Sequence, residues 1–315
     1  MKKIKSLFMN MIFVQLFVNT IALAQEYMTI LDEIYKRESL TLEMEAPEWL
    51  KQAGAGAKDI RLPKVTVQGL KNYSRSTGYL VGDNTFEWET HTYSIDRGIE
   101  FTVDRADNME TIDTAFAFFS REFMRTGVIP EIDAYRFATL AGRALAGATV
   151  EADLAKTTAL QAIDDAIEYL ENTEVPKEGL LFYMSPTVKK YIKQSDLISR
   201  EFITQSGFMA INREVDTIDG MPLKIIPQAR FYTEITLQTG NDAGYIKTAV
   251  TGRDINFLIC DPMAAMADKK IDSMKIFSPE VNQGPDGWLF KYRVYHDIFT
   301  PDNKVPGIYV HHKTT

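Results

Sequence analysis

The chain has 315 residues, with 43 acidic and 35 basic side chains and a formal charge of −8. This charge argues against a broad cationic surface for nucleic acid, because duplex binding depends mainly on clustered Lys and Arg. The single cysteine, Cys260, excludes an intrachain disulfide framework and a cluster of thiolate zinc ligands. Its apolar setting, NFLICDP, predicts a buried structural thiol. A chain of this length can bury a sizeable core and is expected to form two subdomains.

The first 25 residues allow two interpretations. Three lysines precede an apolar run from Leu7 to Ala24, and Ala-Leu-Ala before Gln25 is typical of a signal-peptidase site. At about 18 residues with three polar interruptions, the run is marginal for a spanning helix, which argues against a membrane anchor. The other interpretation is an apolar arm covered by a neighbouring subunit, with Phe13 and Phe17 as interface candidates. These residues alone favour the signal peptide, because all three of its regions are present.

Residues 62–103 change from helical to alternating hydrophobicity. Lys64 to Gln68 alternates, residues 74–84 are rich in Gly, Ser and Asn, and Thr85 to Ile95 alternates again. This pattern predicts a long β-hairpin.

The two faces of this hairpin differ in their side chains. Alternate residues of a strand face opposite sides, so Phe86 and Trp88 share one face while His91 and Tyr93 share the other. A two-stranded ribbon of this length cannot bury its own surface and needs a partner, for which another copy of the chain is the natural candidate. Phe86, Trp88 and Tyr93 are therefore candidate subunit-interface residues, and His91 is expected to be a surface or packing residue.

Two nearly collinear helices are predicted between Asp104 and Gly142, and together they would form a long spine. Asp107 and Glu110 fit a capped helix start, Gly127 suits a helix end, and Pro130 suits the first turn of a second helix. The first helix has apolar residues at helical spacing, which are expected to be buried: Ile112, Phe116, Phe119 and Phe123. The second continues this surface with Ile132, Tyr135, Phe137 and Leu140.

Helices and strands then alternate through a compact unit from about Ala155 to Asp261. Thr158 to Glu171 is an amphipathic helix whose carboxylates predict a solvated face, not paired acid–base groups. Leu180 to Met184 predicts a buried strand, Thr187 to Gln194 a short helix, and Asp219-Gly220 a hairpin turn.

The last part of the chain is rich in predicted strands, at Asp272 to Phe277, Trp288 to Phe299 and Gly307 to His312. Together with residues 98–103 they are expected to form one sheet along the spine. His311 and His312 are expected to lie in a solvated tail near the terminus.

Motifs for chemistry are missing from this sequence. It contains no Gly-x-Ser-x-Gly, no His-Glu-x-x-His, no Rossmann glycine pattern and no calcium loop. The sequence therefore names no catalytic, cofactor-binding or metal-ligating residue, and we predict that the protein is not an enzyme.

The order of these elements resembles that of tailed-phage major capsid proteins of the Hong Kong phage type, over roughly Gln25 to Lys313. Three phrases are similar to capsid proteins from phages of Gram-positive hosts: GLLFYMSPTVKKYIK, IDGMPLKIIPQARF and SPEVNQGPDGWLFKYRVYHDIFTPDNKVPGIYVHHK. The resemblance implies an α+β capsid fold made of an N-terminal arm (residues 1–60), an extended β-hairpin loop (61–97), a peripheral domain with the spine helix (98–154), an inserted axial domain (155–261) and a closing peripheral sheet (262–315).

The same resemblance implies a function and its partners. The expected function is self-assembly, through hexamers and pentamers, into an icosahedral shell around the phage genome. It implies assembly in the host cytoplasm, a place in the virion and no active site, cofactor or membrane. Scaffolding and portal proteins are further expected partners, and packaged DNA is expected to make only weak, non-specific contacts. The resemblance favours the arm interpretation of the first 25 residues.

Two other functions stay open at the level of sequence. An encapsulin-type nanocompartment would use the same shell fold. A secreted binding protein is the alternative of a different class, and it depends on residues 1–24 being a true signal peptide.

Overall fold

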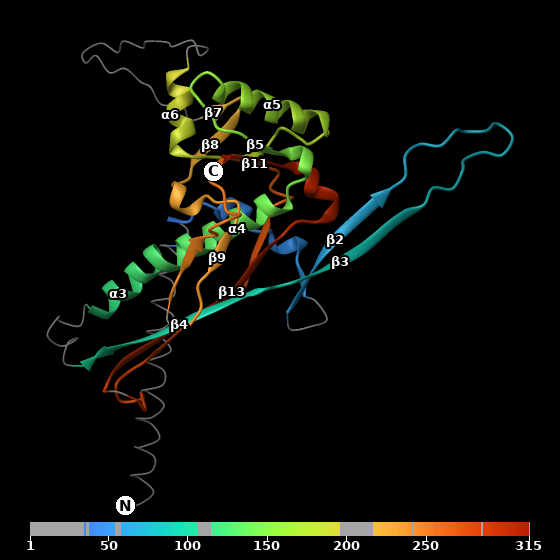
Figure 1. The fold of residues 1–315 in the computed structure, drawn as a ribbon. Coiled ribbons are helices and arrows are strands. Elements are labelled where there is room, and N and C mark those ends of the chain that lie inside the picture. Colours follow the sequence, from blue (N-terminus) through green and yellow to red (C-terminus); the bar gives the residue numbers. More distant parts are fainter. Residues whose placement is uncertain are drawn as a thin grey trace, which may run out of the picture.

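A computed structural model describes Tyr35 and residues 38–53, 58–105, 115–195, 217–240, 242–284 and 286–314 (Figure 1). Phe13 and Phe17, and with them the choice between arm and signal peptide, lie outside the described residues.

The spine is one helical stretch, not two helices separated by a break. It runs through α3 (Ala115–Phe123), the π-helical turn η3 (Met124–Val128) and α4 (Ile129–Arg143). The expectation that Gly127 ends a helix is wrong, because the Ile129 N–H bonds to the Met124 carbonyl and continues the ladder through a wider turn. Pro130 has no N–H to donate, and the wider turn just before it lets the helix continue past this residue.

Burial along the spine increases toward its C-terminal end. Ile132, Phe137 and Leu140 are buried in α4, as their spacing predicts, whereas Tyr135 of the same predicted surface is half-buried. Phe119 in α3 is 58% exposed, so the expectation that it belongs to a buried stripe is wrong. The phenylalanine one turn later, Phe123, is in edge-on contact with the rings of the closing sheet, and Phe119 lies beyond that contact.

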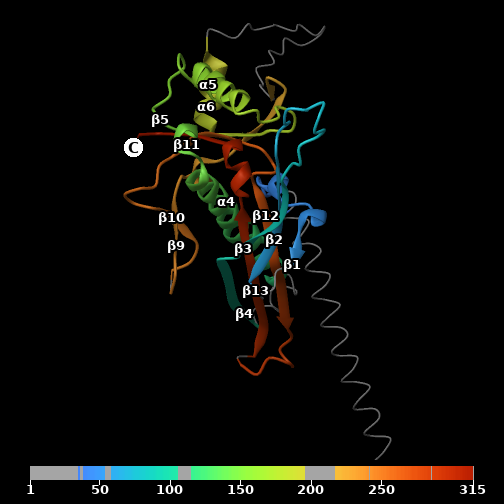
Figure 2. The ribbon, with the colours of Figure 1, turned by 90° about the vertical axis from the view of Figure 1, so that its right-hand side faces the viewer.

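The closing sheet has three antiparallel strands in the order β12-β13-β4. They are β12 (Met266–Phe277), β13 (Gly287–Phe299) and β4 (Ile95–Asp104). Tyr292 of β13 lies opposite Met274 of β12 and Ile99 of β4, and this side of the sheet packs against the spine. Figure 2 shows the spine and the base of β2 and β3 on opposite faces of this sheet.

A second sheet of six strands, β5-β14-β11-β6-β8-β7, forms the inserted unit. Its strands are β5 (Thr149–Glu151), β14 (Ile308–His312), β11 (Ile255–Cys260), β6 (Leu181–Met184), β8 (Met221–Ile225) and β7 (Thr217–Ile218). Helices α5 (Ala159–Asn172) and α6 (Pro186–Gln194) pack on it around one apolar core. The Asp219-Gly220 turn is confirmed, with φ of 48° and 82°.

The last strand differs from the sequence expectation. β14 pairs with β11 and β5 in the inserted unit, not with β12 and β13 in the closing sheet. His311 is therefore 2% exposed and hydrogen-bonded to Asn256, and its assignment to a solvated tail is wrong. His312 is half-buried at the end of the same strand.

The remaining elements are short or extend from the body. Strands β2 (Asp59–Val67) and β3 (Asn84–Thr92) pair as the predicted hairpin, with β1 (Gln52–Ala53) beside the base of β2. Strands β9 (Ile235–Leu237) and β10 (Tyr245–Lys247) form a second hairpin near α4. The 3-10 turns are Leu42–Met44, Glu48–Leu50, Ala146–Ala148, Gln228–Arg230 and Asp302–Gly307.

Candidate assembly surfaces

The hairpin of β2 and β3, here called the ribbon (residues 59–92), extends far from the body (Figure 1). Val65 lies opposite Phe86 and Pro63 opposite Trp88, so these four side chains share one face. Phe86 is 60% exposed and Trp88 is 42% exposed, and their rings meet edge to face with centroids 5.5 Å apart. The ribbon thus presents an uncovered apolar surface, which we call its outer face, as expected from the alternating sequence.

The opposite face of the ribbon is anchored to the body at its base. Ile60 and Leu62 pack in one cluster with Tyr93, Tyr295 and Phe299. Tyr93 is 5% exposed and its hydroxyl donates a hydrogen bond to Asp268. Tyr93 is therefore covered by its own chain and anchors the ribbon to the body. The sequence had instead predicted it as a candidate for the subunit interface.

His91 belongs to the same anchored face. Its ring lies 5.4 Å from that of Phe299, and its Nε2 lies 3.3 Å from Glu89. Burial lowers the pKa of His91, and Glu89 opposes this effect. His91 is thus a packing residue, as predicted.

The tip of the ribbon also exposes apolar side chains. Leu70, Tyr79 and Val81 are almost fully exposed. A pair of backbone hydrogen bonds between Ser74 and Gly78 closes the turn, and Lys71 donates to the Val81 carbonyl over 2.8 Å. The tip is thus shaped by polar backbone contacts while its apolar side chains have no cover within the described chain.

A buried carboxylate joins three distant parts of the chain. Asp133 of α4 is fully buried and accepts hydrogen bonds from Ser39 Oγ at 3.1 Å, Leu40 N at 3.2 Å, Thr41 Oγ1 at 2.6 Å and Arg230 Nη1 at 3.3 Å. Ser39 to Thr41 precede the ribbon, whereas Arg230 belongs to the inserted unit. Asp133 therefore fixes both segments to the spine.

Arg136, one turn after Asp133, completes this connection. Its side chain is fully buried and donates to the Thr41 carbonyl at 3.1 Å and to Thr41 Oγ1 at 3.0 Å. Sequence periodicity missed both residues because charged side chains are rarely fully buried. Their burial could have been predicted from their position among the apolar residues of the second helix.

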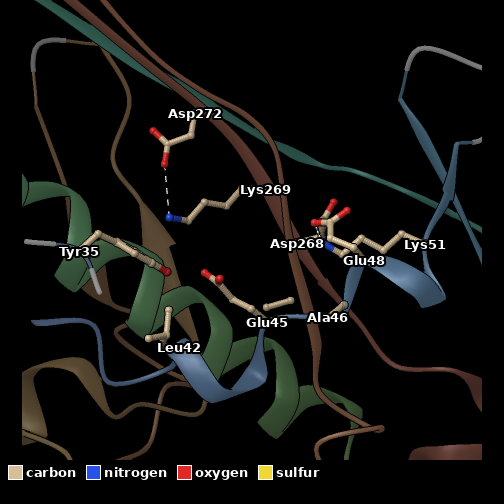
Figure 3. A pocket seen from close by; sticks show the side chains of 10 residues that line it. Tyr35, Leu42, Glu45, Ala46, Glu48, Lys51, Asp268, Lys269 and Asp272 are labelled. Atoms are coloured by element: carbon tan, nitrogen blue, oxygen red, sulfur yellow. Dashed lines mark hydrogen bonds and ion pairs between the residues drawn. The ribbon is translucent and has the colours of Figure 1, made fainter. Parts of the chain in front are cut away.

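A small pocket of about 220 Å³ lies where residues 42–51 cross β12 (Figure 3). Lys51 Nζ lies 2.6 Å from Asp268, and Lys269 Nζ lies 3.3 Å from Asp272 and 3.0 Å from the centre of the Tyr35 ring. Burial lowers the pKa of Lys269, although Asp272 opposes this effect. Because both lysines pair with carboxylates of the pocket, we interpret the pocket as a structural contact between residues 42–51 and the closing sheet.

Arg97 makes a comparable connection between the closing sheet and the β9–β10 hairpin. Its guanidinium donates to Glu131 of α4 at 2.8 Å and to the carbonyl oxygens of Gln238 at 2.6 Å and Gly244 at 3.2 Å. One side chain thus bridges β4, the spine and the β9–β10 hairpin.

No protein-family model matches the sequence. No curated protein matches it either.

Solved structures do match, over most of the chain. The capsid structure of Cyanophage P-SCSP1u is similar with a TM-score of 0.57 and 12% identity, covering 86% of each chain. The mature capsid of bacteriophage PhiM1 is similar with a TM-score of 0.55 and 13% identity, covering 82% of this chain and 83% of the other. A chain of Mycobacterium phage Che8 is similar with a TM-score of 0.54 and 14% identity, covering 85% and 94%.

The chain therefore has the capsid fold of tailed phages.

The described residues include no candidate metal cluster. They contain no group of three or more His, Cys, Asp or Glu side chains placed to share a metal ion. Cys260 is a buried free thiol, as predicted, and its burial raises its pKa. None of the helices that the structure describes is both long and apolar enough to span a bilayer.

Two buried histidines make the stability of this chain depend on pH. Burial lowers the pKa of His296 to about 3 and that of His311 to about 4, so both rings are neutral in the folded chain at neutral pH. In the unfolded chain they protonate near pH 6.5. Their neutral form therefore stabilises the fold above pH 6.5, and this contribution is lost as the pH falls toward the folded values.

We expect acidification from pH 6.5 to pH 5 to lower the free energy of unfolding by about 2 kcal/mol through His296 alone. Urea unfolding of the chain at both pH values measures this change. His296→Phe should remove that part of the pH dependence, and an unchanged slope in the variant would show that His296 is not responsible.

Proposed function

We propose that the chain is the major capsid protein of a tailed phage or prophage and that its copies assemble into an icosahedral shell around the genome. The observation that best supports this proposal is the ribbon. Its outer face exposes Phe86 and Trp88, while its opposite face is already anchored to the body. An apolar surface on a projecting strand pair is explained if another copy covers it.

The capsid fold supports a role for each part of the chain. In this proposal residues 1–60 form an arm, residues 61–97 an extended loop that overlaps a neighbour, residues 98–154 a peripheral domain with the spine, and residues 155–261 an axial domain at the hexamer and pentamer axes. Residues 262–315 close the peripheral sheet, except that β14 pairs within the axial unit. We therefore assign Ile308–His312 to the axial domain.

Partners and location follow from the same proposal. The protein would assemble in the host cytoplasm, together with scaffolding and portal proteins, and then remain in the virion. Contacts with packaged DNA would be weak and non-specific, because the chain has a formal charge of −8. The sequence phrases quoted above support a phage of a Gram-positive host.

Sedimentation and negative-stain microscopy of the full chain test the proposal. We expect closed shells, tubes or capsomers, formed by the chain alone or on co-expression with the scaffolding protein of its phage. Protein that stays monomeric under both conditions would contradict a capsid function.

A further inference from the structure

The pocket between residues 42–51 and β12 contains a buried hydroxyl that the described residues leave unpaired. The Tyr35 side chain is 2% exposed, and its hydroxyl has no hydrogen-bond partner among the described residues. Ser39 lies close to this hydroxyl, but it donates its own proton to Asp133 over 3.1 Å. Buried hydroxyl groups are normally paired, because an unpaired one has lost its bond to water. We therefore expect this hydroxyl to have a partner inside the pocket.

Arg136 brings further unpaired donors to the same place. Its Nη1 binds Thr41, but its Nε and Nη2 are buried and make no hydrogen bond with the described residues. The Nη2 atom lies 3.7 Å from Glu45 Oε1, which is beyond hydrogen-bond distance. Glu45 lines the pocket and its side chain is 38% exposed, so solvent can reach this point. A polar contact longer than about 3.5 Å is a place where water can bridge the two groups.

The pocket has the size and the lining to hold water. Its volume of about 220 Å³ is several times the roughly 30 Å³ that one water molecule occupies in the liquid. Figure 3 shows the Tyr35 hydroxyl and the Glu45 carboxylate pointing toward the same part of the pocket. A buried water molecule needs at least two polar partners, and Tyr35, Glu45 and Arg136 can supply them.

The charges around the pocket favour a neutral ligand that accepts hydrogen bonds. Its unpaired buried groups are all donors, so the ligand must be an acceptor. Three cationic side chains face four carboxylates, which are Lys51, Lys269 and Arg136, and Glu45, Glu48, Asp268 and Asp272. An anion would add to this excess of negative charge, whereas water accepts hydrogen bonds and carries no charge.

We propose that ordered water molecules fill this pocket, where they accept hydrogen bonds from the Tyr35 hydroxyl and Arg136 and donate to Glu45. The water connects residues 42–51, through Glu45, to Arg136 of the spine. Lys269 of β12 lies 3.0 Å from the centre of the Tyr35 ring, so the same group of residues also contacts the closing sheet. The water is thus a structural part of this contact, and its presence does not depend on the proposed capsid function.

A pair of tyrosine variants tests the proposal through stability. Tyr35→Phe removes a hydroxyl that binds water, so urea unfolding of the chain should show the folding equilibrium constant lowered by roughly threefold to tenfold. Tyr183→Phe is the matched control, because its hydroxyl is also buried and unpaired among the described residues but lies in an apolar cluster with Phe137 and Phe231. This control should leave the constant unchanged or raise it, since the hydroxyl has no bond to lose. If Tyr35→Phe behaves like Tyr183→Phe, the proposal is wrong.

A crystal structure of the chain, at a resolution that shows ordered water, examines the pocket directly. We expect density peaks within hydrogen-bond distance of the Tyr35 hydroxyl and of Arg136 Nη2. A pocket without density, in which Glu45 closes onto Arg136, would contradict the proposal. Inorganic phosphate, added at constant ionic strength, should leave the urea midpoint unchanged, and a saturating rise of the midpoint would show an anion site in place of water.

Discussion

Replacing Asp133 with alanine is expected to lower the free energy of unfolding by about 3 to 5 kcal/mol. The carboxylate is fully buried and accepts four hydrogen bonds, so its removal leaves Ser39, Leu40 and Thr41 without this acceptor. It also removes the ion pair with Arg230, whose Nη1 lies 3.3 Å from the Asp133 carboxylate. Urea unfolding of the dissociated subunit measures the change.

Asp165→Ala is the matched control, because this carboxylate is exposed on α5 and forms no ion pair with the described residues. It should change stability by less than about 0.5 kcal/mol. If Asp133→Ala unfolds at the same urea concentration as the control, the described hydrogen bonds do not hold the N-terminal segment on the spine.

Replacing Phe86 and Trp88 together with glutamine is expected to abolish shells while the subunit stays folded. In the single chain Phe86 is 60% and Trp88 42% exposed, so the stability of the subunit should change little. In a shell they would be covered, and losing two buried aromatic side chains would remove about 4 kcal/mol from each contact. This corresponds to a contact weaker by roughly a thousandfold.

Sedimentation and the urea midpoint separate these two effects. Val250→Gln is a control at another exposed apolar residue, 78% exposed, and should leave shells intact. Normal shells from the double variant would show that the outer face is not an essential contact. A large loss of subunit stability would show instead that this face is already packed within one chain.

Local sequence patterns predicted the elements whose environment is local. The alternation on both sides of a Gly- and Asn-rich turn predicted the ribbon, because its two strands are neighbours in sequence. The periodicity of residues 158–171 predicted α5, and Ile163, Ile167 and Leu170 are buried as expected. The apolar residues of Leu180 to Met184 predicted β6 for the same reason.

Long-range pairing could not be predicted in this way. The strand pattern of Gly307 to His312 is equally compatible with either sheet, and it does not show that β14 pairs with β11 about 50 residues earlier in the chain. The continuous spine was missed because glycine and proline usually interrupt helices, whereas a π turn lets the helix pass both residues. The pairing partner of a strand and the width of a helical turn depend on packing with distant residues, and a short sequence pattern does not specify them.

The polar interior was the hardest part to predict. Asp133 fits a first-turn acidic residue that favours the helix dipole, yet the structure shows it fully buried under Ser39 and Thr41. His311 lies near the end of the sequence but in the interior of a sheet. In both residues the burial comes from a distant segment. Among the interface candidates, the same effect separates Tyr93, which its own chain covers, from Phe86 and Trp88, which stay exposed.

A cryo-electron microscopy reconstruction of the assembled full chain tests the central claim most directly, because it shows what covers the ribbon. We predict an icosahedral shell in which the outer face of each ribbon, with Phe86 and Trp88, lies against a neighbouring copy. Particles whose outer face remains in solvent, or a chain that yields only monomers even with its scaffolding protein, would contradict the account.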